Sequence, residues 1–553
     1  MNNKRRFTPL LMCLCVVGGI FIGTHYAYRF GDNTISIASN GSNKLNQLLQ
    51  LIDQNYVDTV NLPELIENAM PQILNELDPH SSYIKANDAE EASEELKGSF
   101  SGIGVSFTMQ KDTVNVMSVI RGGPAEKVGI LAGDRIVKAD TTQLVGMKDT
   151  EVMKCLKGPK DSSVRLGIKR HGKDELTWFT VVRGDIPVQS VDASYMINEK
   201  TGYIQINKFG EQTYAEMLVA LADLTMKGMK NVIIDLRGNT GGYMHIAIQM
   251  ANEFLSRNSL ITYVEGRNIT REEYRSDGKG SFQKLPIIVL VDEGSASSSE
   301  IFAGAIQDND RGTIIGRRTF GKGLVQQPMD FRDGSVVRLT IARYYTPSGR
   351  CIQKPYKKGH GEEYDMELLA RYERGEFFSQ DSIQHDGPEY KTKLGRTVYG
   401  GGGIMPDFFI PEDTVHLTSY YKEAIMTGLL RQFAFNFTDE HRKELNKCVT
   451  MEDVVKYLDK QNLLDKFARF GEKNKLRRRN LMLNRSRKLF ERNLYANIIY
   501  NAKSTKEYIQ FLNQDDPVVL KALDVIGKSE AFPKAPVEEK NKRHEKYNKT
   551  NAT

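Results

Sequence analysis

Residues 285–300 read LPIIVLVDEGSASSSE and decide the fold. The first half of this stretch is almost continuously apolar, which is typical of a strand covered on both faces. A similar run, NVIIDLR, occupies residues 231–237, and the apolar spacing of residues 244–255 predicts a helix between the two strands. This order predicts an α/β core. Each strand runs into a glycine-containing loop, at residues 238–242 and 293–300, where such sheets usually bind ligands.

The loop at residues 293–300 has two compatible interpretations. In the first, Ser297 and Glu300 form a capping box, Ser-x-x-Glu, at the start of a helix over residues 301–307. In the second, one serine of the loop is a nucleophile at a tight strand-to-helix turn. The N–H group of the following residue would then help to bind an oxyanion at the helix N-terminus. This second interpretation also requires a general base.

Histidine is the usual base, but none of the nine histidines lies in a loop that is typical of a catalytic site. His80 lies in a proline-containing turn, and His245 is expected to be an early helix residue. Lys322 stands between two glycines in TFGKGLVQ, residues 319–326, after a predicted strand at residues 313–316. A lysine acts as a base only when it is neutral, so Lys322 must be desolvated, which lowers its pKa. Considered alone, it would be an exposed turn lysine.

Residues 98–183 have a different pattern, with short strands separated by glycine turns. The segments SGIGVSF at residues 101–107, GPAEKVG at residues 123–129 and AGDRIVKAD at residues 132–140 resemble a PDZ domain. The backbone N–H groups of a PDZ glycine loop bind a chain-terminal carboxylate, and the adjacent strand edge accepts the peptide by strand addition. The alternative is a small β-domain whose glycines only form turns. The expected peptide-binding loop consists of Gly102, Ile103, Gly104 and Val105.

These motifs occur together in one family. GSASSSEIFAGAIQD at residues 294–308, followed by TFGKGLVQ at residues 319–326, closely resembles the carboxy-terminal processing, or tail-specific, proteases. These are S41 serine peptidases with a Ser/Lys dyad and a PDZ domain. DLRGNTGG at residues 235–242, LDPHSSY at residues 77–83 and YYTPSGR at residues 344–350 follow the order of the family. The resemblance covers roughly residues 40–412.

The resemblance implies roles for individual residues. It implies that Ser297 is the nucleophile, Lys322 the general base and Gln326 the residue that orients the lysine, with no metal or cofactor. Serines cluster around the nucleophile because Ser298 stands where relatives commonly have alanine. The choice of Ser297 within this cluster therefore depends on its spacing to Lys322.

The oxyanion is expected to be bound by two backbone N–H groups. The resemblance places one on Ser298 and the other on Gly241 or Gly242. Asp308, which some members of the family emphasise, is expected to have a supporting role.

The resemblance also implies the architecture, an α/β fold with a ClpP/crotonase-like Ser/Lys core, an inserted PDZ domain and flanking helical regions. It implies a serine endopeptidase that cleaves exported proteins at or near their C-termini. The alternative is a catalytically silent PDZ scaffold in the cell envelope, because a fold does not guarantee activity. The expected segments are an N-terminal export segment at residues 1–30, a helical region at 31–95, a PDZ domain at 96–185, the protease core at 186–412, and a C-terminal helical region with a disordered tail at 413–553.

The N-terminus predicts export. Lys4, Arg5 and Arg6 precede an apolar stretch at residues 10–23, as in a signal sequence. No small-x-small cleavage site follows, so we expect an uncleaved anchor in the inner membrane, with a cleaved signal peptide as the alternative. In both cases the remainder of the chain is expected in the periplasm or cell envelope.

Composition limits the partners. The 76 basic and 70 acidic residues leave a net charge of only +6, so we expect protein or peptide substrates with exposed C-termini and no nucleic acid. Five scattered cysteines predict neither a disulfide framework nor a zinc site. A basic stretch at residues 473–492 is expected to be a solvated helical face or to assemble with another subunit, which allows a homo-oligomer. Anionic lipid or nucleic acid is the alternative ligand of that stretch.

Overall fold

The computed structural model describes residues 41–536, with the exception of residues 111, 121, 171, 385 and 386. The export segment expected at residues 1–30 and the end of the tail, residues 538–553, lie outside the described part. Within that part, no helix combines the length and the apolar character that a membrane span requires.

The chain divides into two units, residues 1–73 and residues 74–553. The described part of the first unit contains helix α2 (Gly41–Asn55) and most of helix α3 (Leu62–Asn75). The second unit contains all the motifs discussed below.

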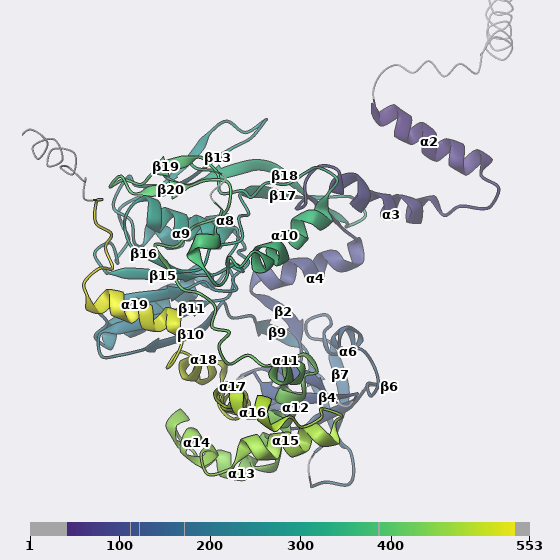
Figure 1. Ribbon diagram of the computed structural model, residues 1–553. Coiled ribbons are helices and arrows are strands. Elements are labelled where there is room, and N and C mark those ends of the chain that lie inside the picture. Colours follow the sequence, from purple (N-terminus) through teal and green to yellow (C-terminus); the bar gives the residue numbers. More distant parts are fainter. Residues whose placement is uncertain (1–40, 111, 121, 171, 385–386, 537–553) are drawn as a thin grey trace, which may run out of the picture. The chain divides into compact units, whose positions relative to one another are not determined.

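A six-stranded sheet forms the centre of the second unit (Figure 1). Strand β10 is antiparallel to β11, and all other neighbours are parallel. The two predicted apolar strands are β12 and β15, and they lie next to each other. In spatial order the strands are β10 (Val191–Met196), β11 (Thr201–Ile206), β12 (Asn231–Asp235), β15 (Ile287–Val291), β16 (Thr313–Gly316) and β21 (Phe408–Phe409).

Helices cover both faces of this sheet. Val232 and Ile234 of β12 pack against helices α7, α8 and α9, whereas Ile233 between them packs against α18 and α19. Two apolar faces explain why the strand sequences are continuously apolar, and the predicted α/β core is confirmed. The helices are α7 (Thr213–Met226), α8 (Met244–Asn252), α9 (Ser298–Asp308), α18 (Thr505–Leu512) and α19 (Pro517–Gly527).

A second, antiparallel sheet joins segments that are distant in sequence. Its strand β18 pairs with β1 on one side and with β17 on the other. This arrangement brings the LDPHSSY segment next to the TFGKGLVQ segment, because Arg338 pairs with Ser82 in β1 and Thr340 pairs with Gln326 in β17. The strands are β1 (Ser82–Ile84), β13 (Leu260–Glu265), β14 (Glu272–Arg275), β17 (Leu324–Asp330) and β18 (Val336–Tyr345).

Smaller elements complete this part of the molecule. Helix α4 (Ala86–Lys97) leads from β1 toward the next domain, helix α10 (Gly361–Glu373) follows β18, and β19 (Glu389–Lys391) pairs with β20 (Thr397–Tyr399).

Residues 99–187 form a β-domain with a core of its own. Its main sheet has the order β3, β4, β5, β7, β8, with β6 beside β5, and strands β2 and β9 pair at the point where the chain enters and leaves. The elements are β2 (Ser99–Gly102), β3 (Val105–Gln110), β4 (Thr113–Val119), α5 (Pro124–Lys127), β5 (Arg135–Ala139), β6 (Thr142–Gln143), α6 (Asp149–Leu156), β7 (Ser163–Lys169), β8 (Thr177–Val182) and β9 (Gly184–Pro187).

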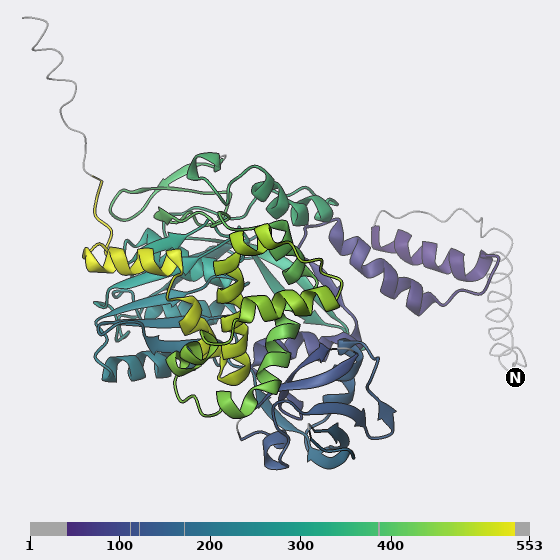
Figure 2. The ribbon, with the colours of Figure 1, turned by 60° about the horizontal axis from the view of Figure 1, so that its bottom comes forward.

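A helical region follows residue 412 and packs around its own apolar core. Figure 2 shows these helices, in green, next to the β-domain, in blue. In the basic stretch at residues 473–492, the apolar side chains of Leu476, Leu483 and Phe490 are buried in this core. The helices are α11 (Ser419–Met426), α12 (Leu429–Glu440), α13 (Arg442–Leu445), α14 (Met451–Leu458), α15 (Leu463–Lys473), α16 (Asn480–Arg485) and α17 (Arg487–Ala502).

Candidate active site

The turn between β15 and α9 has a strained backbone. Ser297 is the residue immediately before α9, and its φ and ψ angles are 54° and −113°. Residues other than glycine rarely adopt a positive φ, so the surrounding structure must stabilise this conformation. A sharp strand-to-helix turn of this kind presents its side chain at the end of the sheet, and Ser297 is half-buried.

The other serines of the cluster are fully buried and hydrogen-bonded. Their hydroxyl groups donate to carbonyl oxygens of the loop at residues 236–242. Ser297 differs from these three serines because it is partly accessible to solvent. The pairs are Ser295 with Leu236 at 2.8 Å, Ser298 with Gly242 at 2.9 Å, and Ser299 with Asn239 at 2.8 Å.

The glycine loop passes directly against the turn. A Cβ atom on Gly241 would lie 2.8 Å from Ser297 Cβ and 3.0 Å from the Ser298 nitrogen, so only glycine fits. The Gly241 N–H group donates to Asn239 Oδ1 at 2.9 Å, and the Gly241 carbonyl accepts from the N–H of Phe209 at 2.9 Å.

These contacts distinguish the two glycines proposed for the oxyanion. The N–H of Gly241 is engaged within the loop. The N–H of Gly242 shares a trans peptide group with the Gly241 carbonyl and therefore points away from Phe209. Gly242 is the better candidate of the two, together with Ser298, whose N–H belongs to the first turn of α9.

One buried carboxylate joins the turn to the lysine loop. Glu300 Oε2 accepts the N–H groups of Ser297 and Lys322, both at 2.9 Å. Its Oε1 accepts the N–H of Gly321 at 2.7 Å and the hydroxyl of Thr319 at 2.5 Å. Burial raises the pKa of Glu300 to about 7, although these four donors favour the ionised form. The predicted contact between Glu300 and the Ser297 backbone is present, and it extends to the second motif.

Tyr344 of β18 makes a second link between the same residues. Its hydroxyl group lies 2.7 Å from the Lys322 carbonyl oxygen and 3.2 Å from the Ser297 carbonyl oxygen, and its side chain is buried. The backbones of Ser297 and Lys322 are thus fixed relative to each other by a carboxylate and by a phenol.

The environment of Lys322 favours its neutral form. Burial is the main cause that lowers the pKa of this half-buried lysine, and the positive charge of Arg338 lowers it further. The carboxylates of Glu300 and Asp78 oppose this shift. The pKa of Lys322 therefore lies below the usual value for lysine, as a general base requires.

Gln326 belongs to a chain of hydrogen bonds that ends at Asp78. Its Nε2 atom donates to Thr340 Oγ1 at 3.2 Å, and the Thr340 hydroxyl donates to Asp78 Oδ1 at 3.0 Å. Asp78 is buried and also accepts the backbone N–H groups of His80 and Ser81, at 2.9 Å each. The LDPHSSY segment thus fixes the side chain that is expected to orient the lysine.

His80 lies in this turn, as the sequence predicts, and its imidazole faces inward. Its Nε2 atom is 2.8 Å from the hydroxyl oxygen of Tyr364. Burial, followed by the charge of Lys322, lowers the pKa of His80 to about 4, so the imidazole is neutral at pH 7.

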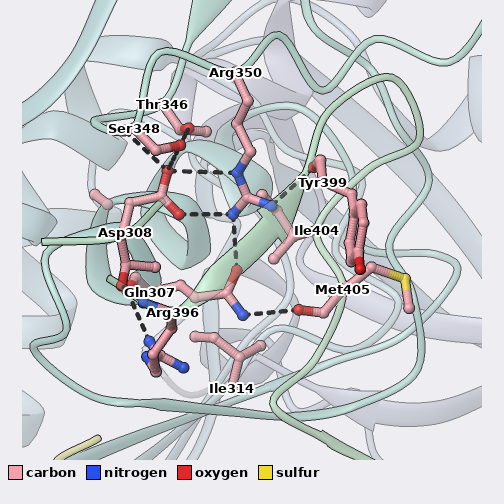
Figure 3. A network of polar contacts seen from close by, with 12 residues as sticks. Gln307, Asp308, Ile314, Thr346, Ser348, Arg350, Arg396, Tyr399, Ile404 and Met405 are labelled. Carbon is pink, nitrogen blue, oxygen red and sulfur yellow. Dashed lines mark hydrogen bonds and ion pairs between the residues drawn. The ribbon is translucent and has the colours of Figure 1, made fainter. Parts of the chain in front are cut away.

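Asp308 lies at the opposite end of α9, about 16 Å along the helix from Ser297. It forms a fully buried ion pair with Arg350 at 2.7 Å and accepts the Ser348 hydroxyl, also at 2.7 Å (Figure 3). Gln307 contacts the same guanidinium at 2.8 Å. Asp308 therefore connects α9 to the YYTPSGR segment and does not reach Ser297.

The expected peptide-binding loop lies between β2 and β3, with Gly102 at the end of β2. The carbonyls of Ile103 and Gly104 accept the N–H groups of Ala125 and Ile120, at 2.8 and 2.9 Å. Because the N–H and C=O of a trans peptide point in opposite directions, the N–H groups of Gly104 and Val105 point away from these partners. This loop is separate from the Ser297 region and lies in the β-domain.

Sequence reasoning missed several residues around the site. Asp78 belongs to the LDPHSSY segment and Tyr344 to the YYTPSGR segment, but the sequence alone assigns no role to either residue. Arg237 of the glycine loop pairs with Asp235 at 2.6 Å and with Asp516 at 2.9 Å. Asp516 precedes α19, and no local signal connects it to residue 237.

No group of three or more potential metal ligands occurs in the described part of the chain.

Comparisons with known proteins identify the family of two of these regions. The profile of the family described as Peptidase family S41 matches residues 200–367, and the profile of the PDZ domain matches residues 101–193. Residues 420–520 match a family of unknown function. The chain is 36% identical over 346 residues to the carboxy-terminal-processing protease of Bartonella bacilliformis, which covers 61% of this chain and 79% of that protein.

Two further relatives are similar. The carboxy-terminal processing protease CtpA of Bacillus subtilis is 34% identical, over 61% of this chain and 72% of that protein. The solved structure of the photosystem II D1 C-terminal processing protease is 28% identical, covers 57% of this chain and 91% of that chain, and has a TM-score of 0.32. On the identity and coverage of the curated relatives, the chain belongs to the carboxy-terminal processing serine proteases of peptidase family S41, with a PDZ domain.

Proposed function

We propose that this protease is an endopeptidase with a Ser297/Lys322 dyad that cleaves polypeptides after its PDZ domain has bound their free C-termini. The observation that carries this proposal is the pair of links between the two residues. Glu300 binds the backbone N–H groups of Ser297 and Lys322, and Tyr344 binds their carbonyl groups. The nucleophile turn and a lysine with a lowered pKa are thereby fixed next to each other.

The chemistry is acyl transfer. Neutral Lys322 takes the proton of the Ser297 hydroxyl while Oγ attacks the carbonyl carbon of the scissile peptide. The N–H groups of Ser298 and Gly242 stabilise the oxyanion. Lys322 then gives the proton to the leaving amine. Water hydrolyses the acyl-enzyme with Lys322 again as base, so that one peptide bond and one water yield two chains and free enzyme. The side chain of Gln326, which is held by its hydrogen bond to Thr340, orients the lysine.

The PDZ domain provides the recognition step. Its loop at Gly102, Ile103, Gly104 and Val105 offers N–H groups that point away from the domain's own partners, which suits a carboxylate. The N-terminal residues 1–30 support a location in the cell envelope, where exported proteins with loosely folded tails would be substrates.

A cleavage assay tests the dyad. Ser297→Ala and Lys322→Ala should each lower hydrolysis of a peptide with a free apolar C-terminus by at least about 1000-fold. Ser281→Ala and Lys284→Ala, which alter exposed residues of the same types, are matched controls. Hydrolysis at the wild-type rate by either dyad variant would refute the mechanism. Full binding of the peptide without turnover by the wild-type protein would instead favour the silent scaffold.

A second comparison tests recognition of the carboxylate. A C-terminally amidated substrate should be cleaved about tenfold less well than the free acid, because it lacks the charge that the loop binds. Gly104→Ala strains this loop, because Gly104 has a φ of 79° and its Cβ would lie 3.0 Å from Ile186. Gly146 has a similar φ, but a Cβ atom there would meet no other atom within 4 Å, so Gly146→Ala serves as the control. Equal cleavage of acid and amide would contradict the recognition step.

A further inference from the structure

Two hollows lie along strand β3 and have part of their lining in common. The first, of about 1230 Å³, is bordered by Asp149 and Met153 of α6 and, from the helical region, by Tyr500 and Thr505. The second, of about 700 Å³, lies between β3 and helices α12 and α17. Residues 106–109 of β3 and Tyr500 line both, so the two hollows adjoin along this strand.

Strand β3 presents a free edge to these hollows. Among the described residues it pairs with β4 alone, at the edge of its sheet. A peptide that adds to β3 as an antiparallel strand places its C-terminus near Val105 and its preceding residues near Met109. The β3 part of the second hollow extends from Ser106 to Met109, so at about 3.3 Å per residue the peptide reaches the far end of this part about four positions before its C-terminus.

The helical wall is attached to the PDZ domain. Asp439 at the end of α12 pairs with Arg135 of β5 at 3.2 Å, and the side chain of this aspartate is largely buried. A Cβ atom on Gly133 would lie 2.9 Å from Asp439 Oδ1, so the two surfaces are in close contact. The wall thus keeps a defined position relative to β3.

We propose that the helical region after residue 412 forms the second half of the peptide-binding groove, and that it binds the part of a substrate tail that precedes the C-terminal residues. This inference rests on the proposed recognition of C-termini by the PDZ domain. It gives a role to residues 420–520, which match a family of unknown function.

The chemistry of the wall defines the ligand. Asn493, Asn497 and Asn501 of α17 line the second hollow. The Nδ2 atoms of Asn493 and Asn497 donate to groups of the helical region, so the Oδ1 atoms are the groups that can accept peptide N–H groups of any sequence. Tyr500 is 37% exposed and packs edge-to-face on Tyr508 at 5.7 Å, which makes it a fixed aromatic contact. Among the described residues that line the second hollow, Arg431 is the only charged one. The ligand is therefore an extended, unfolded tail without a required sequence upstream of its apolar end.

Affinities of peptides of increasing length test this inference. Full-length protein with Ser297→Ala, which prevents cleavage, is titrated with labelled peptides of about four and about eight residues that end in the same apolar residue. The longer peptide should bind about tenfold more tightly. Asn497→Ala and Asn501→Ala, which alter residues that line the second hollow but not the first, should remove most of this gain while changing the affinity of the short peptide less than about twofold. Lys488→Ala, an exposed substitution on α17 outside the groove, should change neither affinity.

The outcomes separate the two proposals. Binding of the short peptide with no gain from the longer one overturns the extended groove and leaves the PDZ recognition step intact. Failure of both peptides to bind overturns both. Equal losses for both lengths in the two wall variants also contradict the groove, because they indicate a general structural defect, which thermal unfolding would report. If the variants change the sedimentation coefficient but not the affinities, the wall is an interface between copies, and the proposal is wrong.

Discussion

Glu300 contacts the backbones of both members of the proposed Ser297/Lys322 dyad. Glu300→Gln preserves the shape of the side chain but replaces an acceptor oxygen by an NH₂ group that faces backbone or hydroxyl donors. We expect kcat to fall at least about 100-fold through misplacement of the dyad. The unpaired buried donors should lower the free energy of unfolding by about 1–3 kcal/mol. Single-turnover kinetics and chemical denaturation measure the two effects.

The control for this substitution is Glu272→Gln, at an exposed position of β14. It should leave both quantities unchanged. Wild-type kcat in Glu300→Gln would show that the carboxylate is not needed to align the turn and the lysine loop.

Arg338 should set part of the pH dependence through Lys322. Its positive charge lowers the pKa of the lysine, so Arg338→Met should raise that pKa and move the rise of kcat/KM to higher pH. Activity in both proteins should increase as Lys322 loses its proton. Arg332→Met, at an exposed position nearby, should leave the profile in place. A shift to lower pH in Arg338→Met would contradict the assignment of Lys322 as the titrating base.

His80 should make the protein sensitive to acid. Its pKa falls from 6.5 in the unfolded chain to about 4 in the fold, so the folded state binds fewer protons between these values. The corresponding stability is present above pH 6.5 and is lost as the pH falls toward 4, by up to about 3 kcal/mol. His80→Gln should flatten the dependence of Tm on pH in this window, whereas the exposed His416→Gln should not. Parallel Tm curves for wild type and His80→Gln would refute this role.

At the scale of single elements, helix α9 is fixed at both ends by different means. Its N-terminus is aligned by Glu300, and its C-terminus by the buried pair of Asp308 and Arg350. Asp308→Asn leaves the guanidinium without its charged partner and should cost about 3–5 kcal/mol of stability. The cleavage activity of the protein that remains folded should depend on pH as in the wild type, because Asp308 does not reach Ser297. Denaturation curves and pH profiles test this, with the exposed Asp381→Asn as control. An altered pH profile with normal stability would indicate a chemical role.

The elements that sequence predicts best are those with a strong local pattern. Strands β12, β15 and β16 could be predicted because apolar residues occupy both of their faces, and α9 because Ser297 and Glu300 mark its start. The chain of hydrogen bonds from Gln326 to Asp78 could not be predicted in this way. It depends on β18 pairing with β1 and β17 at once, and pairing between distant strands leaves no local signal.

At the scale of the whole molecule, the C-terminal helices reach the glycine loop of the active site. Asp516 caps α19 with one carboxylate oxygen and pairs with Arg237 through the other. Asp516→Asn preserves the capping oxygen and removes the charge, so Arg237 should become less fixed and kcat should fall about tenfold with little change in KM. Asp524→Asn, at an exposed position of α19, is the control. An unchanged kcat in Asp516→Asn would show that this contact does not affect the loop.

Motifs in the sequence predict the proposed nucleophile, the proposed base and the PDZ domain, whereas residues 413–553 carry no motif and are predicted only as one helical region with a tail. The structure divides this region, because α11 to α17 pack around their own core and α18 and α19 cover the main sheet. Ile509, Val519 and Val525 pack on the main sheet and so set α18 and α19 apart from the other helices. The sequence does not reveal this, because an apolar helix face has the same pattern whichever surface it covers.

The return of α19 to the main sheet also determines when the central core can be completed during synthesis. Strand β21 ends at Phe409, yet Ile233, Ile288 and Leu290 stay uncovered on one face until residues 517–527 have been made. A chain interrupted anywhere between these points has its motifs complete but half of its central sheet exposed to water. The order of the segments thus delays completion of the core of the main sheet until α19 has been synthesised, after all the motifs of the proposed site.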